Sequence, residues 1–285
     1  MAENLKTLVS NLSKRGPHRV LVGDLAYVGL PGVYTTPAKG KGVPGIAFGH
    51  DGRSPVDDYH ATLRHLASWG IAVAAPNTET GFVADHRGLA NDLESALQIL
   101  GGVLLGEGEV RVSPAKLGLA GHGMGAGAAV LAAAGRENIR SVSCVFPADT
   151  SPSAEAAATN VHCPGLVLGP GENQWLDRGN PKRLAANWAG DVIFREVDGA
   201  EQADFSETPL SRRLLGFSKS SVKQQEITRA ALTGYILATV GGEKKYSAFT
   251  EPDLKMKGVT NRSMEWLRDQ LPETEYVPMP GEPRS

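Results

Sequence analysis

The sequence predicts an α/β protein with a mostly parallel central sheet and helices on both faces. Segments with helical periodicity alternate with short apolar segments along most of the 285 residues. The apolar segments are nearly continuous in Val, Ile, Leu and Ala, which is typical of strands that are buried on both faces. Because there is no internal repeat and no convincing linker, we expect one main domain over residues 18–257.

In the first half of the chain, the expected strands are apolar runs bounded by Gly or Pro. A helix is expected at 54–70, since Ser-Pro and two acidic residues open it and Gly70 ends it. A second helix is expected at 86–105, where four leucines from Leu89 to Leu100 lie on one stripe. Strands are expected at 18–25, 32–37, 46–50 and 71–77, with a loop at 38–45.

The alternation continues in the second half. A strand at 116–122 leads into a glycine-rich loop, followed by a helix of small residues, GAGAAVLAAAG, that is able to pack closely on a sheet. Pro181 stands in the first turn of another predicted helix, a favoured position for proline. The remaining strands are expected at 141–148, 163–170 and 191–199, and the remaining helices at 181–190 and 224–242.

Both ends of the chain extend beyond this alternation. Residues 1–17 are predicted to form an amphipathic helix, because Leu5, Leu8, Val9 and Leu12 share one face. We expect this helix to dock on its own domain or on a partner, with contact to a membrane surface as the alternative. Residues 258–285 contain a short helical pattern, MEWLRDQL, and a Pro-rich end, which we expect to be a docking arm or a mobile tail.

Composition excludes several function classes. The formal net charge is −2 and the pI is near 6.4, so no nucleic-acid-binding surface is expected. The two cysteines are expected to be reduced core thiols. No segment approaches the roughly 20 apolar residues of a membrane span, and the N-terminus lacks the apolar region of a signal peptide. We therefore expect a cytoplasmic protein, with a peripheral position at the inner membrane face as an alternative.

No metal or cofactor is expected. The His, Cys, Asp and Glu residues have no metal-ligand spacing. His60, His65 and His86 are expected on helix or loop surfaces.

The stretch LAGHGMGAG, residues 119–127, has glycine at every second position. One matching motif is the dinucleotide fingerprint G-x-G-x-x-G/A, through Gly121, Gly123 and Ala126. That motif belongs to the first strand–helix unit, whereas this loop follows at least three strands. The fingerprint also needs an acid about 20 residues on, and Asp149 lies 28 residues after Gly121. Dinucleotide binding is therefore a minor alternative.

The second matching motif is the nucleophile elbow G-x-S-x-G, a sharp strand-to-helix turn with a strained central residue. Gly121-His122-Gly123-Met124-Gly125 matches it everywhere except at the centre. The order of elements also agrees with an elbow, because the loop follows the third buried strand in the middle of the chain.

With this loop, the sequence resembles the α/β-hydrolase superfamily, in particular its dienelactone-hydrolase and cutinase-like polyesterase branch, whose elbow is commonly G-[HW]-S-M-G-G. The resemblance extends over roughly residues 25–257. VPGIAFGHDG resembles the strand and loop that supply an oxyanion donor, and LRHLASWGIAVAAPNTET the helix, strand and loop that follow. HCPGLVLGPGEN resembles the strand before the catalytic acid, EVDGAEQADF the catalytic-histidine segment, and GYILATVGGEKKYSAFT the final helix.

The resemblance implies that the catalytic triad is lost. The nucleophile position is Gly123, the acid position is Asn173 (or Glu172 after a shift of one residue), and the histidine position is Gln202. Glycine carries no nucleophile, and an amide does not act as a general base near neutral pH. Since glycine adopts positive φ without strain, we expect the elbow backbone to be retained without its side chain.

The same comparison implies which residues would line the former active site. Backbone N–H groups of Met124 and of Asp51 or Gly52 would be the oxyanion donors, and the guest would be an acyl, ester or lipid-like molecule. His122 is alternatively a packed structural residue, and Asp51 a loop-holding one. The full set of expected ligand-binding residues is His50, Asp51, Gly52, His122, Met124 and Trp175.

The function expected from the sequence is that of a catalytically inactive hydrolase homologue. It would bind a ligand or interact with a protein, and the N-terminal helix or the C-terminal tail would contact a partner or a second copy of the chain. Fold alone does not choose between these roles. The alternative is a working enzyme, either a carboxylic ester hydrolase of the dienelactone-hydrolase-like family that uses non-standard residues or a non-hydrolytic enzyme that uses His50, Asp51, Glu172 or His122.

Overall fold

The structure is a computed structural model, and it describes residues 4–52, 54–81, 83–171, 179–207 and 222–271. Its centre is one sheet with the strand order β1-β2-β4-β3-β5-β6-β7-β8-β9. The strands from β4 to β8 in this order are parallel to one another, whereas β1, β2 and β9 pair antiparallel at the two sides. The predicted α/β class with a mostly parallel sheet is therefore confirmed. The strands are β1 (Val20–Asp24), β2 (Gly32–Pro37), β3 (Gly40–Gly49), β4 (Ala72–Pro76), β5 (Val110–His122), β6 (Val142–Val145), β7 (Gly165–Pro170), β8 (Val192–Val197) and β9 (Val259–Arg262).

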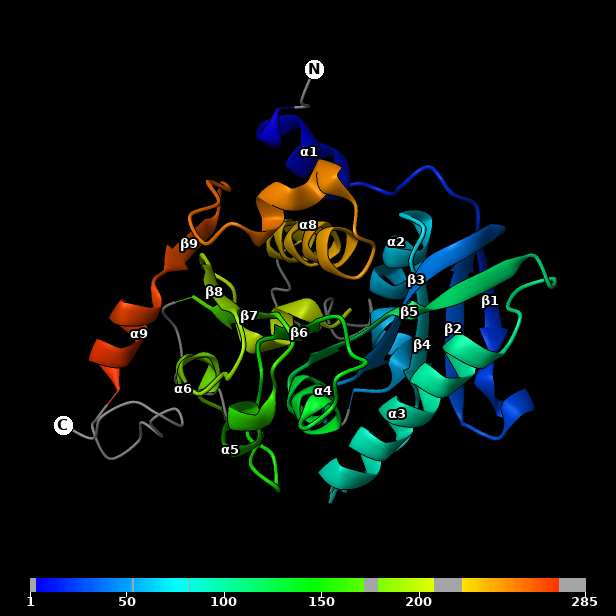
Figure 1. Cartoon of the computed structure of the whole chain (residues 1–285), viewed down its shortest axis with the longest axis horizontal. Coiled ribbons are helices and arrows are strands. Elements are labelled where there is room, and N and C mark those ends of the chain that lie inside the picture. The colour runs from blue at the N-terminus through cyan, green and yellow to red at the C-terminus, as the bar shows by residue number, and fades with distance from the viewer. Residues whose placement is uncertain (1–3, 53, 82, 172–178, 208–221, 272–285) are drawn as a thin grey trace, which may run out of the picture.

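Helices cover both faces of the sheet, with α1, α2 and α8 on one face and α3, α4, α5 and α6 on the other (Figure 1). Two separate clusters of buried apolar side chains lie beneath these two layers. Alternate residues of the central strands enter opposite clusters, as Ile46 and Ala47 do in β3. The helices are α1 (Leu5–Leu12), α2 (His60–Ser68), α3 (His86–Gly102), α4 (Met124–Ala133), α5 (Ala154–Ala157), α6 (Pro181–Ala186), α8 (Val222–Thr239) and α9 (Met264–Gln270), with short 3₁₀ helices η1 (Leu25–Val28), η2 (Val56–Tyr59), η3 (Ala158–Asn160), η4 (Gln202–Phe205) and η5 (Lys244–Thr250).

The expected strands and helices are present, but several boundaries differ from the prediction. β3 begins at Gly40, within the segment expected to be a loop, and β5 begins at Val110 rather than at residue 116. These two extensions pair with each other, with irregular register after Lys41. A pairing between segments about 70 residues apart leaves no local hydrophobic period, so the sequence pattern does not reveal it.

The N-terminal helix α1 docks on its own domain. Leu8 and Leu12 are buried in the cluster beneath α2 and α8, and Leu5 and Val9 are partly buried against it. Half of the apolar stripe that would face a membrane in the alternative interpretation, Leu8 and Leu12, is therefore covered by the protein itself, and the other half is covered in part. None of the helices in the described ranges has the length and apolarity that crossing a bilayer requires.

The segment after residue 258 contributes to the sheet. β9 pairs antiparallel with β8, a strand that the sequence pattern does not predict. The expected short helix is α9, in which Leu267 is fully buried and Trp266 lies against the Arg262 guanidinium at 4.3 Å from its ring centre. Residues 272–285, which contain the Pro-rich end, lie outside the described residues.

Candidate functional site

The glycine-rich stretch forms a sharp turn between β5 and α4. β5 ends at His122, α4 begins at Met124, and Gly123 between them has φ 54° and ψ −120°. Residues other than glycine store about 1–3 kcal/mol of strain in such a conformation. The backbone at Gly123 therefore has the positive φ that the comparison with a nucleophile elbow predicts.

The glycines on either side of this turn are required by close packing. A Cβ atom added at Gly121 would overlap the backbone of Gly125, and one added at Gly125 would overlap the backbone of Gly49 and His50. The end of β3, the end of β5 and the start of α4 thus approach one another through bare backbone. The alternate glycine spacing follows from this three-way contact, and a dinucleotide is not needed to explain it.

The Asp51 carboxylate lies where a side chain at position 123 would stand. A Cβ atom added at Gly123 would overlap this carboxylate, and Asp51 Oδ1 accepts a hydrogen bond from the Met124 N–H at 2.8 Å. The Asp51 N–H in turn donates to the Tyr59 hydroxyl at 3.1 Å. The N–H groups of Asp51 and Met124, which the hydrolase resemblance assigns to an oxyanion, therefore already donate hydrogen bonds within the protein.

Tyr59 and His122 connect the elbow to the segment that carries Gln202. The Tyr59 hydroxyl lies 2.8 Å from His122 Nδ1, and His122 Nε2 lies 2.7 Å from the Gln202 carbonyl oxygen. Because a carbonyl only accepts, Nε2 carries the proton and Nδ1 accepts from Tyr59. Hydrogen bonds thus run in one direction, from the Asp51 N–H through Tyr59 and His122 to Gln202.

The protonation states agree with this direction. Burial lowers the pKa of His122, so the imidazole is held in its neutral form with one N–H. Burial, followed by the nearby Asp51 charge, raises the pKa of Tyr59 well above its usual value, so its hydroxyl remains a donor. The Asp51 N–H, the Tyr59 hydroxyl and both ring nitrogens of His122 each have a partner in this series of hydrogen bonds, which gives His122 a structural role at the elbow.

His50 also has a structural role. Its side chain is fully buried at the end of β3, and its two ring nitrogens lie 2.8 Å from the Asp51 carbonyl and 2.7 Å from the Thr78 carbonyl. The ring therefore connects the loop after β3 to the loop after β4. Gly52 follows in the same loop, and a Cβ atom added there would lie 3.8 Å from Met124 Sδ.

Of the expected triad positions, Gly123 and Gln202 are connected through the backbone contact of Gln202 with His122, and the acid position lies outside the described residues. The carbonyl of Gln202, at the start of η4, contacts His122, the residue before Gly123. Asn173, its alternative Glu172, and Trp175 lie outside the described residues.

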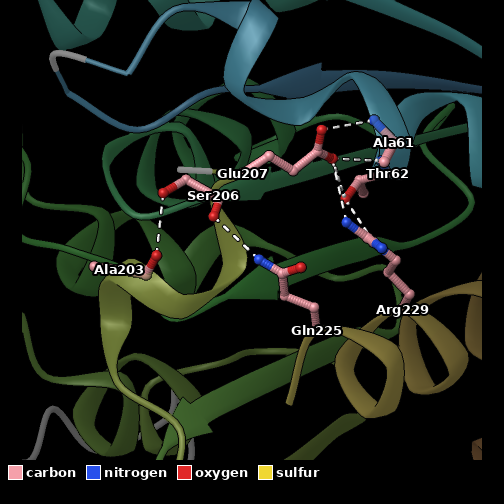
Figure 2. A network of polar contacts seen from close by, with 7 residues as sticks. All are labelled: Ala61, Thr62, Ala203, Ser206, Glu207, Gln225 and Arg229. Atoms are coloured by element: carbon pink, nitrogen blue, oxygen red, sulfur yellow. Dashed lines mark hydrogen bonds and ion pairs between the residues drawn. The ribbon is translucent and has the colours of Figure 1, made fainter. Parts of the chain in front are cut away.

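A second polar network holds the segment after Gln202 in place (Figure 2). The Glu207 carboxylate accepts hydrogen bonds from the N–H groups of Ala61 and Thr62, at 2.8 and 2.9 Å, in the first turn of α2. It also pairs with Arg229 of α8 at 3.2 Å, and Arg229 Nε donates to the Thr62 hydroxyl at 2.9 Å. Two helices and the segment after η4 are thereby joined through one carboxylate.

Three residues of these networks, Tyr59, Glu207 and Arg229, are not predicted from the sequence. Tyr59 stands inside a segment predicted as a plain helix, and the partners of Glu207 are 146 and 22 residues away in sequence. No local motif connects such residues. The one feature of the sequence that points to such a contact is the Tyr59 hydroxyl, a polar group on an otherwise apolar helix face.

Neither thiol nor metal chemistry is supported by the described residues. Cys144 and Cys163 are free and buried, and burial raises the pKa of the Cys163 thiol to about 11. A reactive thiolate needs the opposite shift. Across the ranges that the structure describes, no three His, Cys, Asp or Glu side chains form a group that could hold a metal ion.

Four cavities lined by described residues lie away from the elbow. Their volumes are about 790, 510, 380 and 350 Å³, and none of the four has Asp51, His122 or Gly123 in its wall. The 380 Å³ cavity lies closest in sequence to the expected acid position, since Gly171 lines it.

A comparison with known protein families finds no match for this chain, and a comparison with curated protein sequences finds no relative.

Proposed function

We propose that this chain is an α/β-hydrolase-fold protein that has lost hydrolysis and serves as a binding or interaction module. The observation that carries the proposal is the Asp51 carboxylate, which occupies the place of the nucleophile at a glycine with elbow geometry. The strand order and the resemblance to the dienelactone-hydrolase and cutinase-like branch support it. A serine at position 123 would have neither space nor a free oxyanion donor at Met124.

The same observation bears on where a ligand would bind. An acyl or ester carbonyl at the elbow would have to displace a carboxylate that accepts a charge-assisted hydrogen bond at 2.8 Å. We therefore favour an interaction elsewhere on the molecule over an acyl guest in the former active site.

The first experiment measures hydrolysis by the wild-type protein. Purified protein is assayed on p-nitrophenyl esters of several chain lengths and treated with a fluorophosphonate probe. We expect no turnover above background and no labelled residue. Turnover that co-purifies with the folded protein, or labelling at any residue, would overturn the proposal.

The second experiment rebuilds the expected chemistry. The substitutions Gly123→Ser, Asn173→Asp and Gln202→His restore a triad, and Asp51→Gly supplies the space that the introduced serine side chain needs. We expect esterase activity only when Asp51→Gly is included. The matched control carries all changes except Gly123→Ser, and it should stay inactive.

A second candidate function is ester hydrolysis through Asp51 itself. It is favoured by one fact, that the Asp51 carboxylate stands at the nucleophile's place in the elbow. If wild-type turnover is found, Asp51→Asn decides between the residues, because it keeps the size of the side chain and removes the carboxylate.

A further inference from the structure

The largest of the four cavities, about 790 Å³, lies at the edge of the sheet opposite the elbow. Pro164 and Val192, at the starts of β7 and β8, line it. The elbow follows the end of β5, and β5 to β8 are parallel, so their first residues lie at the other edge. A volume of this size is within the range of about 300–1,000 Å³ that small-molecule sites usually have.

Apolar side chains from several elements form the body of this cavity. Trp188, which precedes β8, and Ile193 of β8 line it. Met264 of α9 lines it from one face of the sheet and Tyr235 of α8 from the other face. Trp188 is held in place because its indole N–H donates to the Cys163 carbonyl at 2.9 Å. The apolar body of a ligand would therefore meet a preformed apolar wall, in which Ile193 and Met264 are more exposed than Trp188.

Tyr235 brings a hydrogen-bond donor to this wall. Its side chain is almost fully buried, and its hydroxyl makes no hydrogen bond to any residue within the described ranges. Burial raises the pKa of Tyr235, so the hydroxyl stays protonated and able to donate. Among the described residues, the buried polar atoms without a partner do not include this hydroxyl, so it keeps contact with water, which a ligand acceptor would replace.

Arg195 of β8 gives the region behind this wall a positive charge. Its side chain is fully buried, and its nitrogens donate to Asn261 Oδ1 and to the carbonyls of Phe249 and Glu251. These partners are neutral, and in the described part of the chain no carboxylate pairs with the Arg195 guanidinium. Thr250, which stands between the residues of these two carbonyls, lines the cavity, and the Arg195 charge acts on the Tyr235 hydroxyl, so the charge lies near the cavity wall.

The charged groups at the rim do not set the sign of a ligand. Arg268 and Asp191 carry opposite formal charges, both line the cavity and both are exposed, so water and salt screen them. His162 is exposed as well. The interior, with the Tyr235 donor in front of the buried Arg195, therefore determines which ligand is favoured.

We propose that this cavity binds a small organic anion with an aromatic or other flat apolar body. The anionic group accepts a hydrogen bond from the Tyr235 hydroxyl near the buried Arg195 guanidinium, and the apolar body packs on the apolar lining that includes Ile193 and Met264. The proposal names a ligand class for the binding role suggested above, but it does not depend on whether the elbow is active.

The test uses 1-naphthoate as the anionic probe and 1-naphthamide as its neutral counterpart of the same shape. Isothermal titration calorimetry is performed on the full chain. We expect saturable binding of 1-naphthoate, about tenfold tighter than that of 1-naphthamide, a ratio that corresponds to about 1.4 kcal/mol. Equal affinities for the two probes, or no binding of 1-naphthoate up to about 10 mM, would overturn the proposal.

Three variants locate the bound probe. Tyr235→Phe removes only the hydroxyl, and we expect it to weaken 1-naphthoate binding by about tenfold. Tyr34→Phe, on β2 at the other side of the sheet, is the matched control and should leave the affinity unchanged. Asp51→Asn should also leave the affinity for 1-naphthoate unchanged, because Asp51 does not line this cavity.

The outcomes separate this proposal from the proposed function. An unchanged affinity in Tyr235→Phe, or a loss of binding in Asp51→Asn, would show that the probe does not occupy this cavity. Circular dichroism spectra of each variant establish that it is folded before titration. Ester hydrolysis by the wild-type protein would overturn the inactive-hydrolase proposal and leave the cavity result standing.

Discussion

The Asp51 carboxylate accepts the backbone N–H of Met124 at 2.8 Å, in the space that any side chain at position 123 would need. The loop of Asp51 and the turn at Gly123 are more than 70 residues apart in sequence, and their side chains would compete for the same space. As long as the Asp51 carboxylate occupies this space, a residue with a side chain does not fit at position 123. In turn, the glycine at 123 leaves room for the carboxylate to reach the Met124 N–H. This mutual dependence leads to the first prediction.

Gly123→Ala should destabilise the protein, by about 1–3 kcal/mol from positive φ alone and further from overlap with Asp51. Asp51→Gly should remove the overlap, so the two substitutions should couple by about 0.5–3 kcal/mol in a double-mutant cycle. Urea unfolding of the four proteins measures this coupling. Additive effects would show that the two residues do not compete for one space.

Tyr59→Phe should destabilise the protein by about 1–3 kcal/mol, because it leaves the Asp51 N–H and His122 Nδ1 without their shared partner. Tyr27→Phe is the matched control, since Tyr27 is 92% exposed, and it should have little effect. Chemical denaturation gives both values. Equal unfolding free energies of Tyr59→Phe and Tyr27→Phe would show that the hydrogen bonds of Tyr59 contribute nothing to stability.

Stability should fall in mild acid because of His65. The sequence pattern predicts this residue on a helix surface, but it is buried, with Nε2 unpaired among the described residues. Burial, followed by the Arg229 charge, lowers the pKa of His65 to about 4. The unfolded chain takes up this proton first, at a pKa of about 6.5, so the contribution is complete above pH 6.5 and is lost as the pH falls toward 4.

The expected loss over this range is about 3 kcal/mol from His65, with His122 acting in the same direction. Unfolding free energies between pH 7 and pH 4 measure it, and His65→Leu should give a flatter profile than the wild type. His162→Asn, at an exposed position, serves as the control and should keep the wild-type profile. An identical slope in the wild type and His65→Leu would contradict this assignment.

Glu207→Gln should weaken both the start of α2 and its connection to α8. The amide keeps the shape of the side chain but loses the charge that two helix N–H groups and Arg229 share. We expect a loss of about 1–3 kcal/mol and faster hydrogen exchange at Ala61 and Thr62. Glu226→Gln, an exposed carboxylate also near Arg229, is the control. The network has no capping role if exchange at these two amides is unaffected.

Much of the fold is predictable from the sequence because its determinants are local. The strand β4 follows from its apolar run, the helix α3 from its leucine stripe and the helix α4 from its run of small residues. The strand β9 is not predictable in this way, since it is four half-buried residues whose only support is pairing with β8. The early start of β3 has the same cause, a partner distant in sequence.

The sequence by itself determined the α/β class, the order of the elements, and a glycine turn at residues 121–125 without a nucleophile. Those features depend on residue types and on spacing within a few turns of chain. Only the tertiary structure decided what fills the turn, because Asp51, Tyr59 and Gln202 reach it from three separate segments, a loop and the 3₁₀ helices η2 and η4. A side chain's partner across the fold depends on how strands and helices pack, and no local period in the sequence records that arrangement.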